Sequence, residues 1–260
     1  MKSALITGAS RGIGYELARE VAKDGYNIVL VSRTKEDLQE VKRELEDDFS
    51  VKGKVITGDL SNPETPKYII EELTDTKFRI DLLINNAGRG QMGEFLLTNE
   101  DVDRELMQLN VNSVVTLTKP FLSRMVNRGH GGIINVSSLA AFQPGPLSAL
   151  YYASKAFVQS FSEALAEEVA NKGITVTALA PGPVDTGFEV KGAKPSGESD
   201  RGYALEPKEV AQSGYEGFKR GKRIVVPGKL LSTAPQLVRF LPRRFVTWFL
   251  RKMHRRRLNK

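Results

Sequence analysis

The sequence has 260 residues and a net charge of +7 at pH 7, with no cysteine and two histidines. The absence of cysteine excludes disulfides, cysteine-ligated zinc and thiol catalysis. The histidines do not suit a Ser-His-Asp triad or a histidine metal site, because His130 lies in a glycine-rich turn and His254 in a basic tail. The charge is uneven, because residues 217–260 include 14 Lys or Arg and no acidic residue, whereas residues 1–216 include 24 basic and 31 acidic residues.

The start of the chain predicts one cytoplasmic domain. The first apolar run, Ala4–Ile6, is soon ended by Gly8, so it is too short for a signal peptide or a membrane-spanning helix. No stretch rich in Pro, Gly and Ser divides two cores, which favours a single α/β domain.

The run Ala4–Ile6 predicts a strand buried on both faces of a parallel sheet, and an amphipathic helix follows it as far as Lys23. In the loop between them, Gly8 permits a tight turn, Gly12 a close backbone approach to a phosphate, and Gly14 packing of the helix on the strand. We therefore predict that the helix N-terminus binds the pyrophosphate of a dinucleotide. The alternative is an ordinary tight turn.

The second predicted strand, Asn27–Val31, ends at a position that bears on the choice of cofactor. In NAD-binding folds an acidic residue about 20 residues past the glycines accepts the ribose hydroxyls. This chain has Ser32 and Arg33 there instead. Arg33, with Arg11 from the glycine loop, can pair with a 2′-phosphate, which favours NADP(H) over NAD(H). The alternative is that both arginines are solvated.

Two more strands are predicted at Lys54–Thr57 and Leu82–Ile84, and a charged surface helix at Glu36–Asp48 precedes the first of them. Asp59, after the third strand, can accept a hydrogen bond from an adenine amino group. Asn85–Gly88, after the fourth strand, combines small and amide side chains, and we expect it near a cofactor ribose.

A long helix is predicted from about Glu100 to Asn127, with Asn110 in its middle. Asparagine inside a helix competes with the backbone for hydrogen bonds. Asn110 is therefore either exposed or has a specific role. A strand at Ile133–Val136 then leads to Ser138.

Ser138, Tyr151 and Lys155 form the candidate catalytic group. The loop after Ser138 has two prolines and a glycine and cannot be helical, so Tyr151 and Lys155 open a new helix, four apart on one face. This trio suits proton transfer at an alcohol oxygen, because the ammonium of Lys155 would lower the pKa of the phenol from about 10 while the Ser138 hydroxyl binds the same oxygen. Alone, Tyr-x-x-x-Lys is a weak pattern, and Tyr152 also faces Lys155.

The remaining predicted elements are a strand at Ile174–Leu179, a helix that starts near Glu206–Pro207 and a strand at Arg223–Val226. The segment Glu189–Gly202 is rich in Gly, Lys and Ser and poor in large apolar residues. We expect it to be a mobile lid over the substrate.

From Lys2 to about Gly228 the chain resembles the short-chain dehydrogenases/reductases in their cytoplasmic form. The motifs occur in family order at family-like spacings, and together they are highly specific: Thr7-Gly8-x-x-x-Gly12-x-Gly14, Asp59, Asn85-Asn86-Ala87-Gly88, Asn110, Ser138, Tyr151-x-x-x-Lys155 and Pro181-Gly182. The resemblance implies a single-domain Rossmann fold, a doubly wound α/β structure with a seven-stranded parallel sheet and helices on both faces.

The resemblance also implies a catalytic tetrad of Asn110, Ser138, Tyr151 and Lys155. The tyrosine would be the acid/base and the serine would orient the carbonyl. The lysine would bind the nicotinamide ribose and lower the pKa of the tyrosine, and the asparagine would hold a water in the proton relay. The family spacing selects Tyr151 over Tyr152.

Arg11 and Arg33 resemble the NADP-preferring members of the family, and no metal is implied. Asn86, Ala87 and Gly88 would line the adenine-ribose side, and Val184 with Thr186 would meet the nicotinamide carboxamide. The implied cofactor-binding residues are Gly8, Ser10, Arg11, Gly12, Ile13, Gly14, Ser32, Arg33, Asp59, Leu60, Asn86, Ala87, Gly88, Tyr151, Lys155, Pro181, Gly182, Val184 and Thr186.

The chain departs from the family pattern after Gly228, and we divide it into a catalytic domain, 1–228, and a basic helical extension, 229–260. One side of the predicted C-terminal helix is apolar and the other is mainly basic: Phe245, Trp248, Phe249 and Met253 against Arg244, Thr247, Arg251 and Arg255. This pattern leaves open docking on the body or on a sister subunit and peripheral membrane contact through 235–260. Nucleic acid is disfavoured, because aromatic and basic residues are not interleaved elsewhere.

Two functions agree with the sequence. The first is an oxidoreductase that transfers a hydride between NADP(H) and a carbonyl or secondary alcohol, with Tyr151 as general acid/base. The alternative is a catalytically silent NADP(H)-binding sensor or regulatory protein with the same fold. All four reacting positions are filled, which favours the enzyme. We expect it to act on a small-molecule carbonyl or alcohol and to form a homo-oligomer (dimer or tetramer). The substrate itself cannot be read from the sequence.

Overall fold

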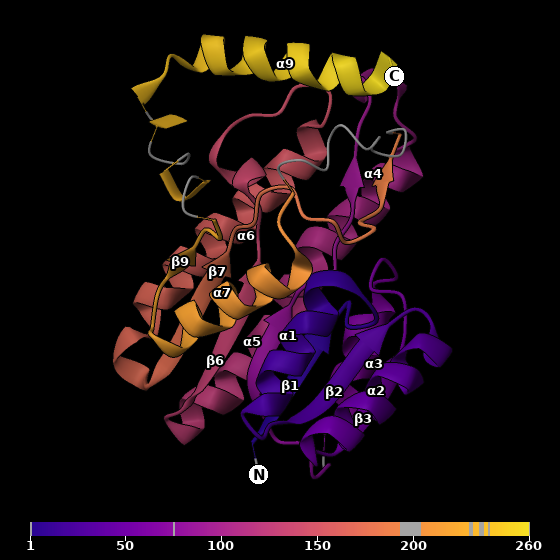
Figure 1. The fold of residues 1–260 in the computed structure, drawn as a ribbon, viewed down its shortest axis with the longest axis vertical. Coiled ribbons are helices and arrows are strands. Elements are labelled where there is room, and N and C mark those ends of the chain that lie inside the picture. Colours follow the sequence, from indigo (N-terminus) through magenta and orange to yellow (C-terminus); the bar gives the residue numbers. More distant parts are fainter. Residues whose placement is uncertain are drawn as a thin grey trace.

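The computed structural model describes residues 2–74, 76–192, 204–228, 231–233, 237–238 and 240–259. Its centre is a sheet of seven parallel strands in the order β3-β2-β1-β4-β6-β7-β9 (Figure 1). These strands are β1 (Ser3–Thr7), β2 (Asn27–Ser32), β3 (Gly53–Thr57), β4 (Ile80–Asn85), β6 (Gly131–Val136), β7 (Ile174–Leu179) and β9 (Ile224–Val225). The predicted doubly wound sheet is confirmed.

Helices cover both faces of this sheet. One face carries α1 (Gly12–Lys23), α2 (Lys35–Phe49) and α7 (Pro207–Lys219), and the other carries α3 (Glu64–Glu72), α5 (Ser113–Arg128) and α6 (Ala149–Glu168). Within β1, Ala4 and Ile6 join the core under the first set, whereas Leu5 joins the core under the second. An apolar run without polar alternation is what such a doubly covered strand requires.

The strand order changes direction between β1 and β4, and this point brings two loops together. From β1 the chain builds the sheet outward through β2 and β3, and then returns to add β4, β6, β7 and β9 on the other side. In open parallel sheets, ligands bind at the carboxyl ends of the strands at such a point. The glycine loop follows β1 there, and Asn85–Gly88 ends β4 there.

A second, two-stranded sheet was not predicted from the sequence. In it, β5 (Gly90–Gln91) pairs in parallel with β8 (Val190–Lys191). Val190 and Lys191, near the start of the predicted lid, thus lie in a strand. Residues 193–202 of the predicted lid lie outside the described part of the chain.

The long helix predicted around Asn110 is divided in three. It consists of α4 (Glu100–Met107), a π-helical turn (Gln108–Asn112) and α5. Single π-helical turns inside α-helices are frequent at functional sites. The turn places Asn110 in the molecular interior, where it is 1% exposed.

The predicted C-terminal helix is α9 (Arg243–Asn259), which lies along the end of the molecule opposite the N-terminus (Figure 1). Its buried side chains are Val246, Leu250 and His254, whereas the aromatic side chains predicted as its apolar face are about half exposed. The helix thus docks on the body, through a stripe that the sequence analysis did not identify. The division of the chain at 228 stays a prediction.

Candidate active site

The glycine loop has no room for larger side chains. Gly8 and Gly12 have φ angles of +65° and +60°, which favour glycine. A Cβ on Gly14 would overlap the carbonyl oxygen of Gly8, and a Cβ on Gly12 would lie 2.8 Å from the Cβ of Thr186. The loop therefore presents bare backbone at the N-terminus of α1, with Thr186 close beside it.

Thr7 and Asn86 hold this loop against the end of β4. Thr7 Oγ1 accepts hydrogen bonds from the backbone N–H groups of Asn86 and Ala87, each at 3.0 Å. Asn86 Nδ2 donates to the carbonyl oxygens of Thr7 (2.9 Å) and Gly8 (3.1 Å). The amide of Asn86, predicted to line a cofactor, thus has a positioning role in the loop, and Thr7, the first residue of the glycine motif, is its partner.

Arg11 and Arg33 both lie beside the segment that precedes β8. Arg33 is 61% exposed, and its guanidinium is 3.6 Å from a carboxylate oxygen of Glu189. Arg11 is exposed, and its guanidinium lies 3.9 Å from where a Cβ on Gly187 would be. The two arginines thus approach one region from the glycine loop and from the end of β2, as the 2′-phosphate prediction requires.

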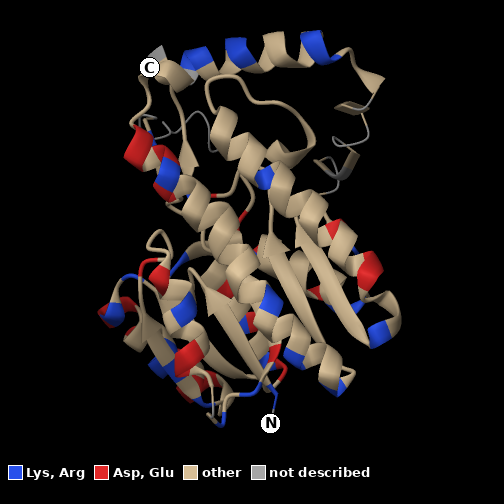
Figure 2. Ribbon diagram, turned by 180° about the vertical axis from the view of Figure 1, so that it is seen from behind, with Lys and Arg blue, Asp and Glu red and all other residues tan. Residues whose placement is uncertain are grey.

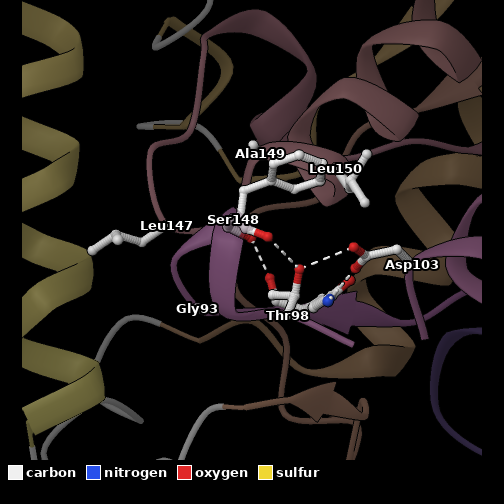
Figure 3. A pocket seen from close by; sticks show the side chains of 9 residues that line it. Gly93, Thr98, Asp103, Leu147, Ser148, Ala149 and Leu150 are labelled. Carbon is white, nitrogen blue, oxygen red and sulfur yellow. Dashed lines mark hydrogen bonds between the residues drawn. The ribbon is translucent and has the colours of Figure 1, made fainter. Parts of the chain in front are cut away.

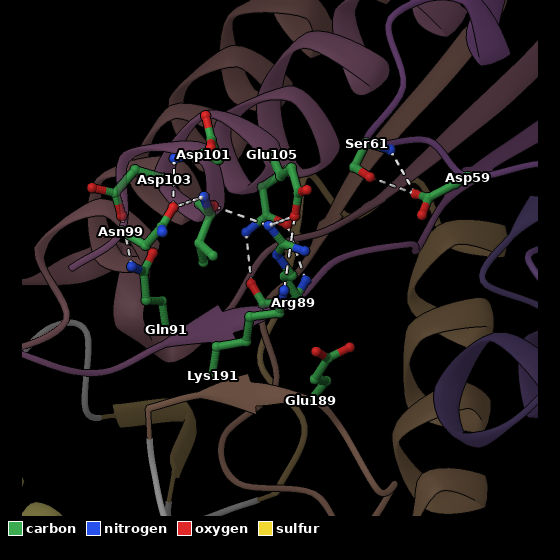
Figure 4. A network of polar contacts seen from close by, with 12 residues as sticks. Asp59, Ser61, Arg89, Gln91, Asn99, Asp101, Asp103, Glu105, Glu189 and Lys191 are labelled. Atoms are coloured by element: carbon green, nitrogen blue, oxygen red, sulfur yellow. Dashed lines mark hydrogen bonds and ion pairs between the residues drawn. The ribbon is translucent and has the colours of Figure 1, made fainter.

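The residues predicted for adenine lie after β3. Asp59 is exposed, and its Oδ1 accepts hydrogen bonds from the N–H of Ser61 at 2.9 Å and from its hydroxyl at 2.7 Å (Figure 4). Leu60 is 4% exposed and belongs to the core, so only its backbone is available to a ligand.

The side chain of Ser138 lies close enough to Tyr151 to lower the pKa of its phenol. Ser138 follows β6, where its Oγ accepts from the N–H of Ala140 at 3.1 Å, and Tyr151 lies in the first turn of α6. Burial raises the pKa of Tyr151 above 10.0, and the nearby Ser138 side chain lowers it only in part. The prediction that Lys155 holds this pKa below its ordinary value is wrong, because burial dominates.

Lys155 is buried beside Gly88. Its side chain donates to the carbonyl oxygen of Val136 at 2.8 Å, and burial lowers its pKa from 10.5 to about 8. A Cβ on Gly88 would lie 3.4 Å from Lys155 Nζ and 3.2 Å from Asn110 Oδ1. Because Gly88 has no side chain, Lys155 Nζ and Asn110 Oδ1 both border the space beside its Cα.

Asn110 links two parts of the site through its side chain. Its Oδ1 accepts from the N–H of Arg89 at 3.1 Å, and its Nδ2 donates to the carbonyl oxygen of Arg89 at 3.0 Å and to Ser154 Oγ at 3.1 Å. Ser154 in turn donates to the carbonyl oxygen of Tyr151 at 2.7 Å. Ser154 belongs to this network, and no motif in the sequence indicates it.

Replacing Asn110 is expected to destabilise the fold as well as the site. Asn110→Ala should lower the free energy of unfolding by about 2–3 kcal/mol, because it leaves buried polar groups of Arg89 without partners. Urea unfolding would measure the change. The control is Asn112→Ala, an exposed residue of the same turn, which should change stability by less than about 0.5 kcal/mol; equal losses would contradict the role given to Asn110.

The two adjacent tyrosines point to different partners. The Tyr152 hydroxyl lies 3.1 Å from Nε2 of His254 on α9, whereas the Tyr151 phenol lies beside Ser138. The ring of Phe188 lies 6.1 Å from that of Tyr151 between centroids, and the sequence analysis did not select it. This geometry supports Tyr151 as the acid/base candidate.

The side chain of Arg89 connects the backbone between Gly88 and β5 to α4. Its side chain is buried, and its guanidinium donates to the carbonyl oxygen of Val102 at 2.9 Å and to Glu105 at 2.8 Å (Figure 4). The hydrogen bond from Arg89 lowers the pKa of Glu105. Lys191 of β8 lies 3.8 Å from the same carboxylate, so the network joins α4 to the small sheet. The only feature of the sequence that indicates this network is the arginine directly after Asn85–Gly88.

The loop before α6 is held in a strained conformation. Leu147 has φ of +65°, which is rare for a bulky residue. Its carbonyl oxygen accepts from the N–H of Gly93 at 2.8 Å, and the hydroxyl of Ser148 donates to the carbonyl oxygen of Gln91 at 2.6 Å. Figure 3 shows the pocket between this loop and the segment after β5, with Leu147 pointing toward α9.

The predicted nicotinamide end is built on the segment after β7. The carbonyl oxygen of Pro181 accepts from the N–H of Leu139 at 2.9 Å, which brings this segment to the turn that follows Ser138. Val184 forms a bridge with Leu205, and Thr186 lies over Gly12. The remaining predicted positions are half-buried: Ser10, Ile13, Ser32 and Gly182.

Comparison with known proteins agrees with this arrangement. Residues 2–195 match the family model for short chain dehydrogenases. The chain is 39% identical over 189 residues to very-long-chain 3-oxoacyl-CoA reductase-B of Danio rerio and 38% identical over 185 residues to 17-beta-hydroxysteroid dehydrogenase type 3 of Mus musculus. These alignments cover 71% and 70% of this chain, but 60% of each relative.

A similar solved structure is a short-chain dehydrogenase from Sphingobium yanoikuyae in complex with NADPH. It is 29% identical in sequence and superposes with a TM-score of 0.82 over 92% of each chain. The family model covers most of the sheet, the glycine loop and the Ser138–Lys155 region. The chain therefore belongs to the short-chain dehydrogenase family.

Proposed function

We propose that this protein is an NADP(H)-dependent oxidoreductase that reduces the carbonyl group of an apolar substrate. The observation that carries the proposal is that the Ser138 side chain lies beside the Tyr151 phenol, at the edge of the sheet where the glycine loop lies. Two hydroxyl groups in this position can bind one carbonyl oxygen and protonate it.

The residues around the glycine loop fit a dinucleotide with a 2′-phosphate. Gly8, Gly12 and Gly14 leave backbone N–H groups free of side chains at the start of α1, which suits a pyrophosphate. Arg11 and Arg33 are exposed cations beside one segment, which suits the additional phosphate. The NADPH complex of the similar Sphingobium enzyme supports the same choice.

The state of Tyr151 favours the direction of reduction. Because burial raises its pKa above 10.0, the phenol keeps its proton at neutral pH and can act as a general acid. When bound, NADPH supplies the hydride for the carbonyl carbon, and Tyr151 supplies the proton for the oxygen. Ser138 orients that oxygen, and the buried ammonium of Lys155 holds the ribose.

An apolar substrate is proposed from two observations. The aromatic ring of Phe188 packs near Tyr151, and the relatives named above act, by their names, on long-chain 3-oxoacyl thioesters and on hydroxysteroids. The test is NADPH consumption with steroid ketones, 3-oxoacyl thioesters, small aldehydes and ketosugars. Higher kcat/KM for the first two classes is expected, and faster turnover of ketosugars would reject the apolar class.

Arg33 is expected to set the preference for NADPH. Arg33→Ser should raise the KM for NADPH about 10- to 100-fold, because one charge-assisted hydrogen bond contributes about 1.5–3 kcal/mol, and should leave the KM for NADH nearly unchanged. Initial rates with both cofactors measure the effect. Arg43→Ser, an exposed arginine on α2, is the control. A similar increase for both cofactors would show that Arg33 does not bind the 2′-phosphate.

Self-association and a cytoplasmic location are further proposals. Val115 on α5 and Phe157 on α6 are 37% and 40% exposed, and Phe157 stacks on Phe161 at 5.6 Å. Exposed apolar residues on two neighbouring long helices suit a homodimer interface. Sedimentation of Val115→Asp and Phe157→Asp variants tests it, and unchanged oligomeric mass would reject this face.

A further inference from the structure

The C-terminal helix α9 is fixed on the body by one of its faces. Val246, Leu250 and His254 occur every four residues, and each is 5% exposed or less. His254 contacts the carbonyl oxygen of Pro146 at 2.7 Å through Nδ1 and the Tyr152 hydroxyl at 3.1 Å through Nε2. Because these contacts fix the rotation of the helix, they also determine which side chains face outward.

The outward face of α9 is aromatic over its first half. Phe245, Trp248 and Phe249 are 50%, 57% and 53% exposed, and the rings of Phe245 and Trp248 lie 6.1 Å apart. Just before the helix, Phe240 is 87% exposed and Leu241 44%. Large apolar side chains grouped in this way are typical of an interaction surface.

Exposed basic side chains flank this aromatic cluster, and the positive charge continues to the end of the helix. The exposed basic residues of α9 with described side chains are Arg243, Arg244, Arg251, Lys252, Arg255 and Arg256. The sequence has no acidic residue after Glu216 to neutralise them locally, and Figure 2 shows basic bands along α9 with no acidic one. Lys252 lies 5.5 Å from the centre of the Trp248 ring, so aromatic and cationic groups share one surface.

We propose that this outer face of α9 binds the surface of a membrane that contains anionic phospholipids. The helix would lie in the plane of the interface, with its aromatic rings at the boundary between headgroups and acyl chains and its basic side chains on lipid phosphates. Within the described residues, no helix has the length and apolarity needed to cross a bilayer. The proposed mode is therefore attachment to the surface.

Two other occupants suit the face less well. A second copy related by two-fold symmetry would bring the same patch against itself, so that six described basic residues of each copy would repel one another. Nucleic acid would match the charge. However, it would leave the aromatic cluster at the start of the helix, Phe240 to Phe249, without an apolar partner along a duplex backbone.

Trp248 provides a direct probe, because it is the only tryptophan in the chain. The full-length protein is titrated with vesicles of phosphatidylcholine alone and with vesicles that also contain phosphatidylserine. We expect co-sedimentation and a blue shift of the Trp248 emission with the anionic vesicles, and quenching by lipids brominated near the headgroup. A protein that stays in the supernatant with unshifted emission overturns the proposal.

Two surface variants separate the contributions of the face. Phe245→Ser with Phe249→Ser should weaken vesicle binding about 10-fold or more while Trp248 remains as the probe. Arg251→Gln, Lys252→Gln, Arg255→Gln and Arg256→Gln together should weaken it about 600-fold, because each basic residue near an anionic surface contributes roughly a factor of 5. The matched control replaces four exposed lysines elsewhere by Gln, at Lys35, Lys52, Lys172 and Lys222, and should bind vesicles as tightly as the unmodified chain.

Three further outcomes decide against the membrane. Tighter binding to duplex DNA or RNA than to anionic vesicles would assign the face to nucleic acid. Loss of oligomeric mass in the Phe245→Ser and Phe249→Ser variant would assign it to a second copy. Equal loss of vesicle binding in the control lysine variant would show that binding depends only on the net charge of the protein and not on α9. Retained NADPH binding shows that each variant is folded.

Discussion

Tyr151→Phe is expected to lower kcat for carbonyl reduction about 10²- to 10⁴-fold, which is the contribution of a positioned general acid. The substitution removes the hydroxyl beside Ser138 and keeps the ring that packs near Phe188. NADPH consumption with the best ketone of the substrate panel measures the loss. NADPH affinity, measured separately, should change little, because the phenol acts on the substrate oxygen.

The adjacent tyrosine provides a matched control. Tyr152→Phe removes a hydroxyl that contacts His254 at 3.1 Å, and not one of the groups assigned to the reaction, so most of the turnover should remain. If Tyr152→Phe abolished turnover and Tyr151→Phe did not, the acid would be Tyr152. If neither variant changed the rate, or if no ketone or aldehyde were reduced at all, the silent cofactor-binding alternative would gain support.

The elements that the sequence predicted well are those determined by local pattern. The strands at β1 and β2 follow from apolar runs, because helices on both faces of the sheet remove any need for polar alternation. The glycine loop was predictable for a similar reason: Gly8 and Gly12 adopt backbone conformations that other residues rarely take. The position of Ser138 followed from the strand before it and the prolines after it.

The elements that were missed depend on contacts distant in the sequence. The small sheet pairs Gly90 with Val190, and two-residue strands carry no pattern of their own. The pKa of Tyr151 depends on how deeply the fold buries it, which residue spacing does not show. The sequence of α9 has two stripes that could face the body. The stripe that packs on the body is the one with His254, which bonds to Tyr152 and Pro146.

Lys155→Met is expected to abolish most of the activity and yet leave the fold as stable or more stable at pH 7. Loss of a preorganised charge at the site should lower kcat/KM about 100-fold or more. Lys155 is 5% exposed, and the difference between its ordinary pKa of 10.5 and its value of about 8 in the fold corresponds to roughly 3 kcal/mol that burial of the ammonium costs. The lost hydrogen bond to Val136 offsets about 1 kcal/mol or more of that gain.

The stability advantage of Lys155→Met should also depend on pH in one direction. Below pH 8 Lys155 is charged in the folded and unfolded chains, so the burial penalty is complete. Between pH 8 and 10.5 the folded protein releases the proton that the unfolded chain still holds, so the unfolding free energy of the unmodified protein rises with pH. The difference between the two proteins, measured by urea unfolding at pH 7 and pH 9.5, should therefore shrink at the higher pH. Lys172→Met, at an exposed position, should show no such dependence, and an advantage that grew with pH would contradict the buried-ammonium account.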